Sequence, residues 1–492
     1  MKQFEEGLGR WVVRFRWFLI IASLLVAGAF GSGMANLTMS SDGRVFFSKE
    51  NPQLQALEEL ENTYTKTENI LFALAPKDGN VFTRKTLAAI EELTEASWQI
   101  PFSNRVDSIT NYQHTTAEGD DLIVEDLVTD AMKLTDDELA QKRAVALAEP
   151  LLVNRIISDT GSVTGVNINV LKPGLDGNES PVVTNFAREI AKKFRANHPE
   201  IDLYISGGVL MDTAFGEAGA EDGATLLPIM FAVIFVLLGL LLRSITGIFS
   251  ALMVLIMSVI TGMGFAGLIG IDLTPASTNA PTIILTLAVA DSIHLLVTLF
   301  HEMRNGKSKH EAIIESIRIN LQPVFLTSVT TAIGFLTMNF SDAPPFHDLG
   351  NMVAVGVMAA LVYSVLFLPA LMAVLPVKVK PTPKGGWHLS KMADSLGRFV
   401  VARQKGLLWS MSALMLILAS GVVFIQLDDN FVKYFDTRYE FRRASDFVSN
   451  NLSGLDIIEY SLKSGEPSGI NKPDYLKKVE AFANWYRAQP NV

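Results

Sequence analysis

Seven long apolar stretches constrain this chain more than any other feature of its sequence. Each is about 18–27 residues long with few or no charges, which at ~1.5 Å per residue is enough to cross a hydrocarbon layer of ~30 Å. Buried helices of such length and number would be unusual in a water-soluble protein. We therefore expect seven membrane spans, at residues 17–34, 224–242, 245–269, 280–300, 322–340, 351–377 and 407–427.

Composition excludes several classes of function. Charged residues make up only 19% of the 492 residues, and the net charge of −10 does not favour nucleic-acid binding. The chain has no cysteine, which excludes disulfides, cysteine-ligated metals and thiol catalysis. It has neither a GxGxxG motif after a strand nor a GxxxxGK[ST] motif. We expect no enzyme activity, no cofactor and no metal site.

Lysine and arginine residues predict how the spans are oriented. They gather in the N-terminal arm and in alternate loops, whereas the short loops 270–278 and 341–348 have none. The N-terminus is therefore expected in the cytoplasm, and segments 36–223 and 428–492 outside. The outer segment 36–223 is acidic, with 31 acidic and 16 basic residues. A signal peptide is an alternative for the first stretch, but a copy of this stretch recurs in mid-chain.

That copy belongs to an internal repeat with an offset of 388 residues. The sequence LGRWVV at 8–13 reappears as LGRFVV at 396–401, and the likeness continues through the first and seventh spans. Six spans per unit predict parallel repeats. The expected parts are an arm with the first span (1–35), an external domain (36–223), a five-span cluster (224–377), a cytoplasmic linker (378–405), the seventh span (406–427) and the opening of a second external domain (428–492). A truncated second copy predicts a longer protein; the alternative is a small complete cap.

The external domain has the pattern of an α/β fold. Residues 69–75, 105–110 and 201–206 are predicted strands, and 151–158 with 163–171 is a predicted hairpin. Helices are predicted at 83–98 with Thr83 as N-cap, from Thr135 with Glu138 completing a capping box, and at 181–197. This order suggests a ferredoxin-like split βαβ unit with an insertion near 111–150.

One acid lies close to the middle of a predicted span. Asp291 is placed in the fourth span, where a carboxyl group costs at least ~2.5–3.5 kcal/mol and usually marks an ion or proton route. His294 follows three residues later on the same helical face. A structural hydrogen bond to a neighbouring helix is the alternative role for either residue. His301, His310 and His347 are expected in loops.

Two neighbouring spans carry residues that fit such a route. The third span has closely spaced glycines that allow tight helix packing, namely Gly264, Gly267 and Gly270. The fifth span has hydroxyls that could solvate the carboxylate or pass protons, although each could equally bond its own helix backbone: Thr327, Ser328, Thr330 and Thr331.

Together these stretches resemble the resistance–nodulation–division superfamily, in particular its mycobacterial-membrane-protein-large (MMPL) type in the hydrophobe/amphiphile exporter branch. The layout of one span, a large external domain and five spans, then repeated, is similar. The matching motifs are LRS at 242–244, VADSIHLL at 289–296, LTSVTTAIGF at 326–335, residues 341–350 and LPAL at 368–371.

The resemblance implies a multi-pass protein of the bacterial inner membrane whose external porter domain and proton flow drive export of hydrophobic or lipid-like molecules. It makes Asp291 the proton-relay acid, with Ser292 where the family often has tyrosine and Ala290 where the drug-efflux branch has a second acid. The relay partners of the family lie on a tenth span, which this sequence does not contain. Membrane lipids, a homo-oligomer or periplasmic accessory proteins are the implied partners.

Two alternatives stay open at this stage. The five-span cluster is also similar to a sterol-sensing domain, which would make the chain a lipid-binding receptor. An accessory subunit for protein translocation uses the same superfamily fold.

Overall fold

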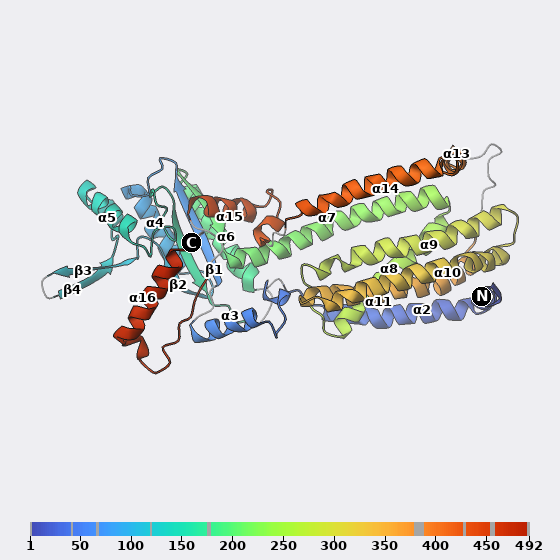
Figure 1. Ribbon diagram of the computed structural model, residues 1–492, viewed down its shortest axis with the longest axis horizontal. Coiled ribbons are helices and arrows are strands. Elements are labelled where there is room, and N and C mark those ends of the chain that lie inside the picture. Colours follow the sequence, from blue (N-terminus) through green and yellow to red (C-terminus); the bar gives the residue numbers. More distant parts are fainter. Residues whose placement is uncertain are drawn as a thin grey trace. The chain divides into compact units, whose positions relative to one another are not determined.

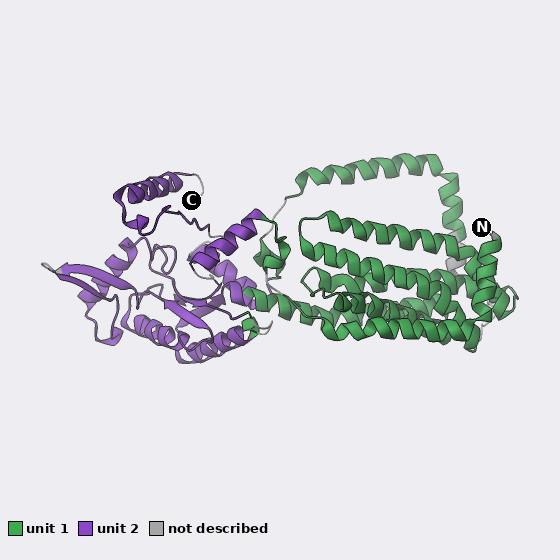
Figure 2. Ribbon diagram, turned by 90° about the horizontal axis from the view of Figure 1, so that it is seen from below, with its two compact units in different colours: residues 1–51, 174–181, 211–436 green, residues 52–173, 182–210, 437–492 purple. Residues whose placement is uncertain are grey.

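The computed structural model describes residues 2–40, 43–64, 68–118, 121–174, 179–377, 388–426, 430–452 and 458–489. Within these ranges, seven helices are long and apolar enough to cross a membrane: residues Arg16–Asn36, Gly208–Leu242, Ile245–Leu268, Ser277–Arg304, Lys309–Phe340, Pro344–Val374 and Gln404–Phe424. The chain divides into two compact units (Figure 2). Residues 1–51, 174–181 and 211–436 form a helical unit, and the remainder forms an α/β unit.

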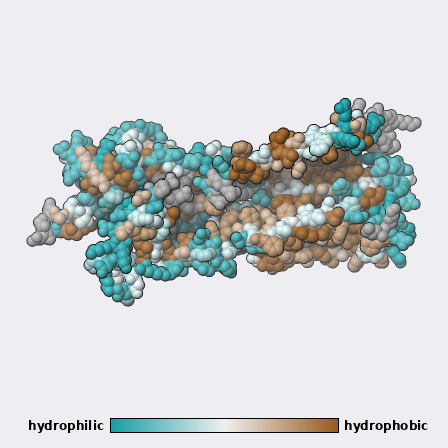
Figure 3. All heavy atoms as spheres, in the orientation of Figure 1, coloured by the Kyte–Doolittle hydropathy of each residue, from teal (hydrophilic) through white to brown (hydrophobic). Residues whose placement is uncertain are grey.

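The helical unit is built from the predicted spans and their flanking helices (Figure 1). Its helices are α1 (Lys2–Arg14), α2 (Arg16–Gly31), α7 (Gly208–Leu242), α8 (Ile245–Leu268), α9 (Ala280–Arg304), α10 (Lys309–Leu336), α11 (Pro344–Val362), α12 (Leu368–Val374), α13 (His388–Ala402) and α14 (Gln404–Ser420). Helices α8, α9 and α11 pack against one another, and α10 packs against α9 and α11. Hydrophobic residues gather over these helices, whereas the visible face of the α/β unit is largely hydrophilic (Figure 3).

Three spans begin well before their predicted starts; the sixth begins at Pro344, and the other two differ more. Helix α7 starts at Gly208, sixteen residues before the predicted start, and so continues directly from the strand before it. Helix α10 starts at Lys309 because Ser308 and Glu311 form a capping box, in which each side chain binds the backbone N–H of the other residue. Hydropathy missed this polar first half of the helix.

The sixth span is interrupted by a short π-helical turn. Residues Tyr363–Phe367 form the turn η6, which joins α11 to α12. The backbone N–H of Leu368 donates to the carbonyl of Tyr363, five residues earlier. Such a turn inserts one residue into the helix and is often found at functional sites.

The α/β unit contains a four-stranded antiparallel sheet in the order β2-β5-β1-β6. Its strands are β1 (Glu68–Pro76), β2 (Ser103–Asp107), β5 (Thr164–Val170) and β6 (Ile201–Ser206), with helices α4 (Arg84–Ser97) and α6 (Glu179–Asn197) between them. Between β2 and β5 lie the hairpin β3 (Gln113–Glu118) with β4 (Asp121–Asp126) and helix α5 (Asp136–Ala148). Without that insertion, the chain order is the β-α-β-β-α-β of a split βαβ unit.

Local signals explain which elements were predicted correctly. Thr83 caps α4 by accepting a hydrogen bond from the N–H of Thr86, and Thr135 with Glu138 forms the predicted capping box of α5. The predicted hairpin of 151–158 with 163–171 is wrong. Residues 151–158 make only isolated bridges, and β5 instead pairs with β1 and β2. Apolar content alone did not distinguish a compact loop from a strand.

A helix from near the C-terminus also packs on this sheet. Helix α15 (Glu440–Asn451) contacts β6, where Phe447 stacks on Tyr204 with ring centroids 3.9 Å apart. The hydroxyls of Ser445 and Ser206 lie 2.8 Å apart. The α/β unit further contains α3 (Pro52–Thr63) and α16 (Pro473–Arg487). Segments nearly 240 residues apart in sequence thus share one core.

Candidate functional site

The central acid of the bundle is buried. Asp291 lies in the middle of α9, which begins at Ala280 with Pro281 in its first turn. The residue is only 7% exposed, because α8, α10 and α11 surround α9. Among the residues that the structure describes, Asp291 forms no ion pair with a basic side chain. A carboxyl group in this position must be compensated by hydrogen bonds or carry a proton.

The partner of Asp291 is a serine on the next helix. The Ser328 hydroxyl of α10 lies 3.0 Å from Oδ2 of Asp291 and 2.8 Å from the carbonyl oxygen of Val324. A serine hydroxyl has one hydrogen to donate. When Asp291 is ionised, Ser328 donates to the carboxylate. When Asp291 is protonated, it can donate to Ser328 while Ser328 donates to Val324, so the pair accommodates both states.

The pair is held in place by the hairpin that α9 and α10 form. Two contacts join the helices between the acid and the α9–α10 connection. The amide of Asn320 donates to the hydroxyl of Thr298 at 2.8 Å, and the hydroxyl of Ser316 donates to the carbonyl of Leu295 at 2.6 Å. Buried hydrogen bonds of this kind fix both the rotation and the register of the two helices.

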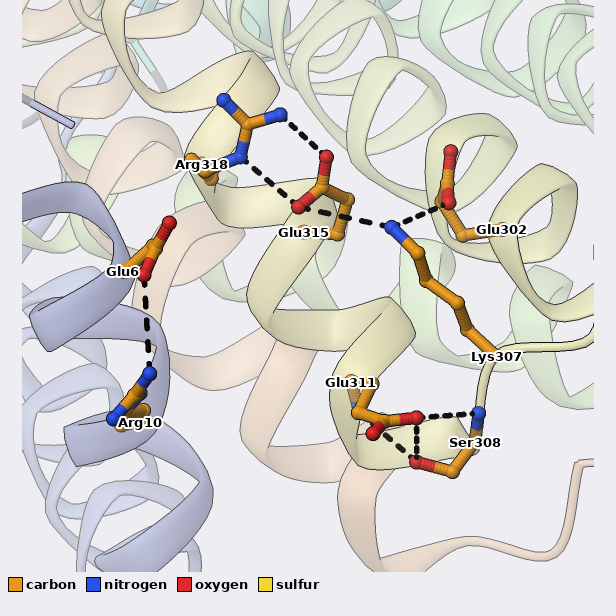
Figure 4. A network of polar contacts seen from close by, with 8 residues as sticks. All are labelled: Glu6, Arg10, Glu302, Lys307, Ser308, Glu311, Glu315 and Arg318. Atoms are coloured by element: carbon orange, nitrogen blue, oxygen red, sulfur yellow. Dashed lines mark hydrogen bonds and ion pairs between the residues drawn. The ribbon is translucent and has the colours of Figure 1, made fainter. Parts of the chain in front are cut away.

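Charged side chains tie the same hairpin at its connection (Figure 4). Lys307 lies 2.8 Å from Glu302 at the end of α9 and 3.8 Å from Glu315 of α10, and Glu315 also pairs with Arg318. We call Glu302, Lys307, Glu315 and Arg318 the hairpin ion cluster. Hydrogen bonding to Glu302 raises the pKa of Lys307 above its ordinary value.

The other predicted residues lie in different environments. His294 is exposed on the surface of the helical unit and lies close enough to Asp291 for an electrostatic interaction, although no hydrogen bond joins the two side chains among the described residues. Thr327 and Thr330 are largely exposed and donate to carbonyls of their own helix. Thr331 is half-buried, while Ser292 is fully buried beside the acid. Of the four hydroxyls named in the fifth span, the structure brings Ser328 to Asp291.

Sequence reasoning missed a second group of polar residues, which lies where the sixth span meets α8. The Tyr363 hydroxyl of the π-turn lies 2.9 Å from the Thr261 hydroxyl of α8, and Ser364 follows it, fully buried. No residue spacing in the sequence signals a π-turn, and Ser364 stands in a run of apolar residues. The only available signal was the pair of polar residues, Tyr363-Ser364, inside an apolar span.

The glycines fall into two groups. A Cβ on Gly264 would lie 1.9 Å from the carbonyl oxygen of Phe30, and one on Gly267 equally close to that of Gly33, so α8 and the first span touch backbone to backbone here. Gly270 was wrongly grouped with them. It has φ +74° and open space around it, and the N–H of Ile271 donates to Ala266, so Gly270 ends α8 in a Schellman turn.

The three histidines expected in loops are in helices instead. His301 lies in the last turn of α9, His310 in the first turn of α10, and His347 in α11. In the part of the chain that the structure describes, no group of three or more histidine or acidic residues is placed to hold a metal ion.

A polar cavity lies at the other end of the helices, where α8 ends and α11 begins. Its volume is about 230 Å³, and its lining includes two acids, Asp272 and Asp348. Asp272 accepts a hydrogen bond from Thr38. Asp291 does not line this cavity. It lies in the middle of α9, about three helical turns beyond the first residue of that helix.

These features define a polytopic membrane protein with a buried intramembrane acid, as is typical of membrane transporters. The chain belongs to the MMPL family, within the resistance–nodulation–division superfamily: the family model matches residues 50–406.

Three relatives show how far the likeness extends. A putative membrane protein of Methanocaldococcus jannaschii is 24% identical over 380 residues, which cover 75% of this chain and 93% of that protein. The siderophore exporter MmpL5 of Mycobacterium tuberculosis is 23% identical and the probable transport protein MmpL9 of the same species 26% identical. Each of these matches covers 46% of this chain and 24% of the relative. The chain thus spans about a quarter of the two mycobacterial relatives.

Proposed function

We propose that this chain is part of a proton-driven exporter of hydrophobic or lipid-like molecules, and that Asp291 takes up and releases the proton. The observation that carries the proposal is the burial of Asp291 with a hydroxyl, rather than a cation, as its partner. A carboxyl group so placed has two stable protonation states, and Ser328 supplies a hydrogen-bonding arrangement for each.

Family membership supports transport as the activity. The two mycobacterial relatives are named as a siderophore exporter and a probable transport protein. Proton coupling and a hydrophobic substrate come from the resemblance of residues 289–296 and 326–335 to the family motifs, together with the environment of Asp291. Within this proposal Ser328 positions the carboxyl group, and His294 has no assigned part because it is exposed.

The topology belongs to the same proposal. We place the hairpin ion cluster in the cytoplasm of a bacterial cell and the α/β unit outside the inner membrane as a porter domain, because basic residues mark the cytoplasmic loops. Parallel repetition is supported by element boundaries: α2 and α14 begin at Arg16 and Gln404, and α3 and α15 at Pro52 and Glu440, both 388 residues apart.

The test is export by the full-length protein carrying Asp291→Asn. Transport of a fluorescent lipid analogue into inverted membrane vesicles, which corresponds to export from the cell, is measured with an imposed proton gradient at matched expression. We expect a loss of at least ~100-fold, as for removal of an acid–base group. Glu302→Gln, which changes a paired acid of the same helix, is the matched control and should keep most of the export.

Normal export by Asp291→Asn would contradict the proton-relay role of Asp291. If the wild-type protein binds the lipid analogue yet moves none, and the proton gradient has no effect, the lipid-binding receptor is the better description.

A further inference from the structure

Two buried serines of the helical unit, one of them next to Asp291 in sequence, have hydroxyls with no hydrogen-bond partner among the residues that the structure describes. Ser292 follows Asp291 in α9, and Ser364 lies in the π-turn of the sixth span. Both are 0% exposed. Buried polar groups nearly always have a partner, so an unpartnered one in a native core points to a bound water or ion.

Their behaviour differs from that of nearby hydroxyls. Ser250, Ser258 and Thr261 of α8 are also buried, and each donates to the carbonyl four residues earlier in its own helix. This is the usual way for a hydroxyl to be satisfied inside a membrane helix. Ser292 and Ser364 could do the same but leave their hydroxyls for another partner.

The two serines lie at the same level along the axes of two neighbouring parallel elements, α9 and the sixth span. A Cβ on Gly356 of α11 would lie 2.4 Å from Cδ1 of Ile284 of α9, so these two residues face each other. Helices α9 and α11 run in the same direction because α10 returns between them by short connections (Figure 1). Ser292 and Ser364 each come eight residues later, and α9 packs against the π-turn.

The packing around them confirms that both face the interior. Ala288 and Leu295 of α9, one turn before and after Ser292, belong to the same buried cluster as Ala360 of α11 and Tyr363 of the π-turn. Ser364 lies one turn beyond Ala360. The extra residue of a π-turn widens the helix at this point.

The chemistry of the pair selects its ligand. Each hydroxyl offers one donor and two lone pairs. A metal cation would use lone pairs only and leave both O–H groups unsatisfied, and an apolar ligand would use neither. A water molecule both donates and accepts, and therefore fits two hydroxyls that need partners of either kind.

We propose that Ser292 and Ser364 hold a water molecule between α9 and the π-turn, and that Asp291 exchanges its proton through this site. The second half rests on the proposed function. A hydronium ion at this position gives its proton to the Asp291 carboxylate and remains as water; on release, the carboxyl group returns the proton to the water. Ser364 then becomes a positioning residue for proton transfer.

The absence of cysteine from the sequence provides a direct test of the water site. In the full chain, Ser292→Cys and Ser364→Cys each change one atom and create a unique thiol. Ala288→Cys and Ala360→Cys are matched controls, since both alanines are fully buried on the same helix faces one turn away. Silver ions are added in membranes, and the remaining thiols are counted with a maleimide after unfolding.

We expect the two serine-site cysteines to be blocked at least ~10-fold faster than the two controls, because only a thiol in contact with water ionises and reacts. Equal rates at all four positions would overturn the water site. This readout needs no transport activity. If the cysteines react as expected but Asp291→Asn still exports, the water site stands and the proposed proton relay fails.

A second set of variants tests the role of the site in proton transfer. Ser364→Ala should slow proton-driven export by ~10-fold, and Ser364→Thr should restore it because the hydroxyl is kept. Ser258→Ala is the control, since that hydroxyl is already bonded to Val254. Unchanged export by Ser364→Ala at matched expression, or an equal loss with Ser258→Ala, would contradict the role.

Discussion

The α9–α10 hairpin carries two polar clusters whose acidic side chains are compensated in different ways. At its connection, the hairpin ion cluster balances two acids with two bases at partly exposed positions. Further along the same helices, Asp291 is buried against Ser328, and among the described residues it has no lysine or arginine partner. Paired charges near water hold a structure together, whereas an unpaired buried carboxyl group is costly unless its protonation changes. Under the proposed function, the first cluster is structural and the second changes its protonation state.

Replacement by leucine should separate the two clusters most sharply. Asp291→Leu should abolish export and raise the free energy of unfolding by about 1–3 kcal/mol, because it removes a buried polar group from the membrane interior. Glu315→Leu should leave export largely intact and lower stability, because Arg318 and Lys307 lose a partner. Thermal unfolding in detergent with parallel export assays measures both. A loss of stability in Asp291→Leu would contradict the comparison.

Removal of the Ser328 hydroxyl should have the next largest effect. Ser328→Ala deprives the ionised carboxylate of its donor, and export should fall by about tenfold, with Ser328→Thr close to wild type. Thr327→Ala is the control, since that exposed hydroxyl donates to the backbone of its own helix. The three initial rates are compared at saturating proton gradient. Equal effects of Ser328→Ala and Thr327→Ala would mean that contact with Asp291 is unimportant.

Glu315→Gln should have a smaller effect, and one that depends on salt. The pairs of Glu315 with Arg318 and Lys307 lie near water, where ions screen them. The unfolding temperature of the variant should be slightly below that of the wild type at low salt and equal to it at high salt. A difference that persists in high salt would show that the cluster is less solvated than its exposure indicates.

The pH dependence of the ion cluster should be the smallest effect. Hydrogen bonding to Glu302 raises the pKa of Lys307 in the folded state, so its contribution to stability is fully present below the ordinary lysine pKa of ~10.4 and is lost as pH rises through the higher folded value. Between roughly pH 6 and pH 9, the free energy of unfolding of Lys307→Met should therefore differ from that of the wild type by a constant amount. A difference that varies across this range would place another titrating group in the cluster.

Much of the fold could be predicted from the sequence where the signal was local. Seven apolar stretches predicted the seven candidate spans, and Thr83, Thr135 and Glu138 predicted the starts of two helices that the structure confirms. Local signals failed where the same amino-acid composition is compatible with two different local structures. The apolar segment 151–158 is a loop rather than a strand, and Gly270 ends a helix rather than packing against one.

The candidate site divides in the same way. Asp291 could be identified because an acid in an apolar run is visible in sequence alone. The choice of Ser328 among four neighbouring hydroxyls could not be made, and Ser364 drew no attention, because both depend on which faces of α9, α10 and the π-turn meet. Helix rotation is set by side-chain packing from several spans together.

The sequence by itself determined which segments are apolar enough to enter a membrane, where several helices begin and that an acid lies among them. These properties depend on transfer free energy and on hydrogen bonds between residues a few positions apart. Only the tertiary structure decided that Asp291 meets Ser328, that His294 is exposed and that Ser292 and Ser364 share a level. Those pairings arise from close contacts at glycines, such as Gly264 against the backbone of Phe30 and Gly356 against the side chain of Ile284, and from the π-turn, which together fix the register of whole helices.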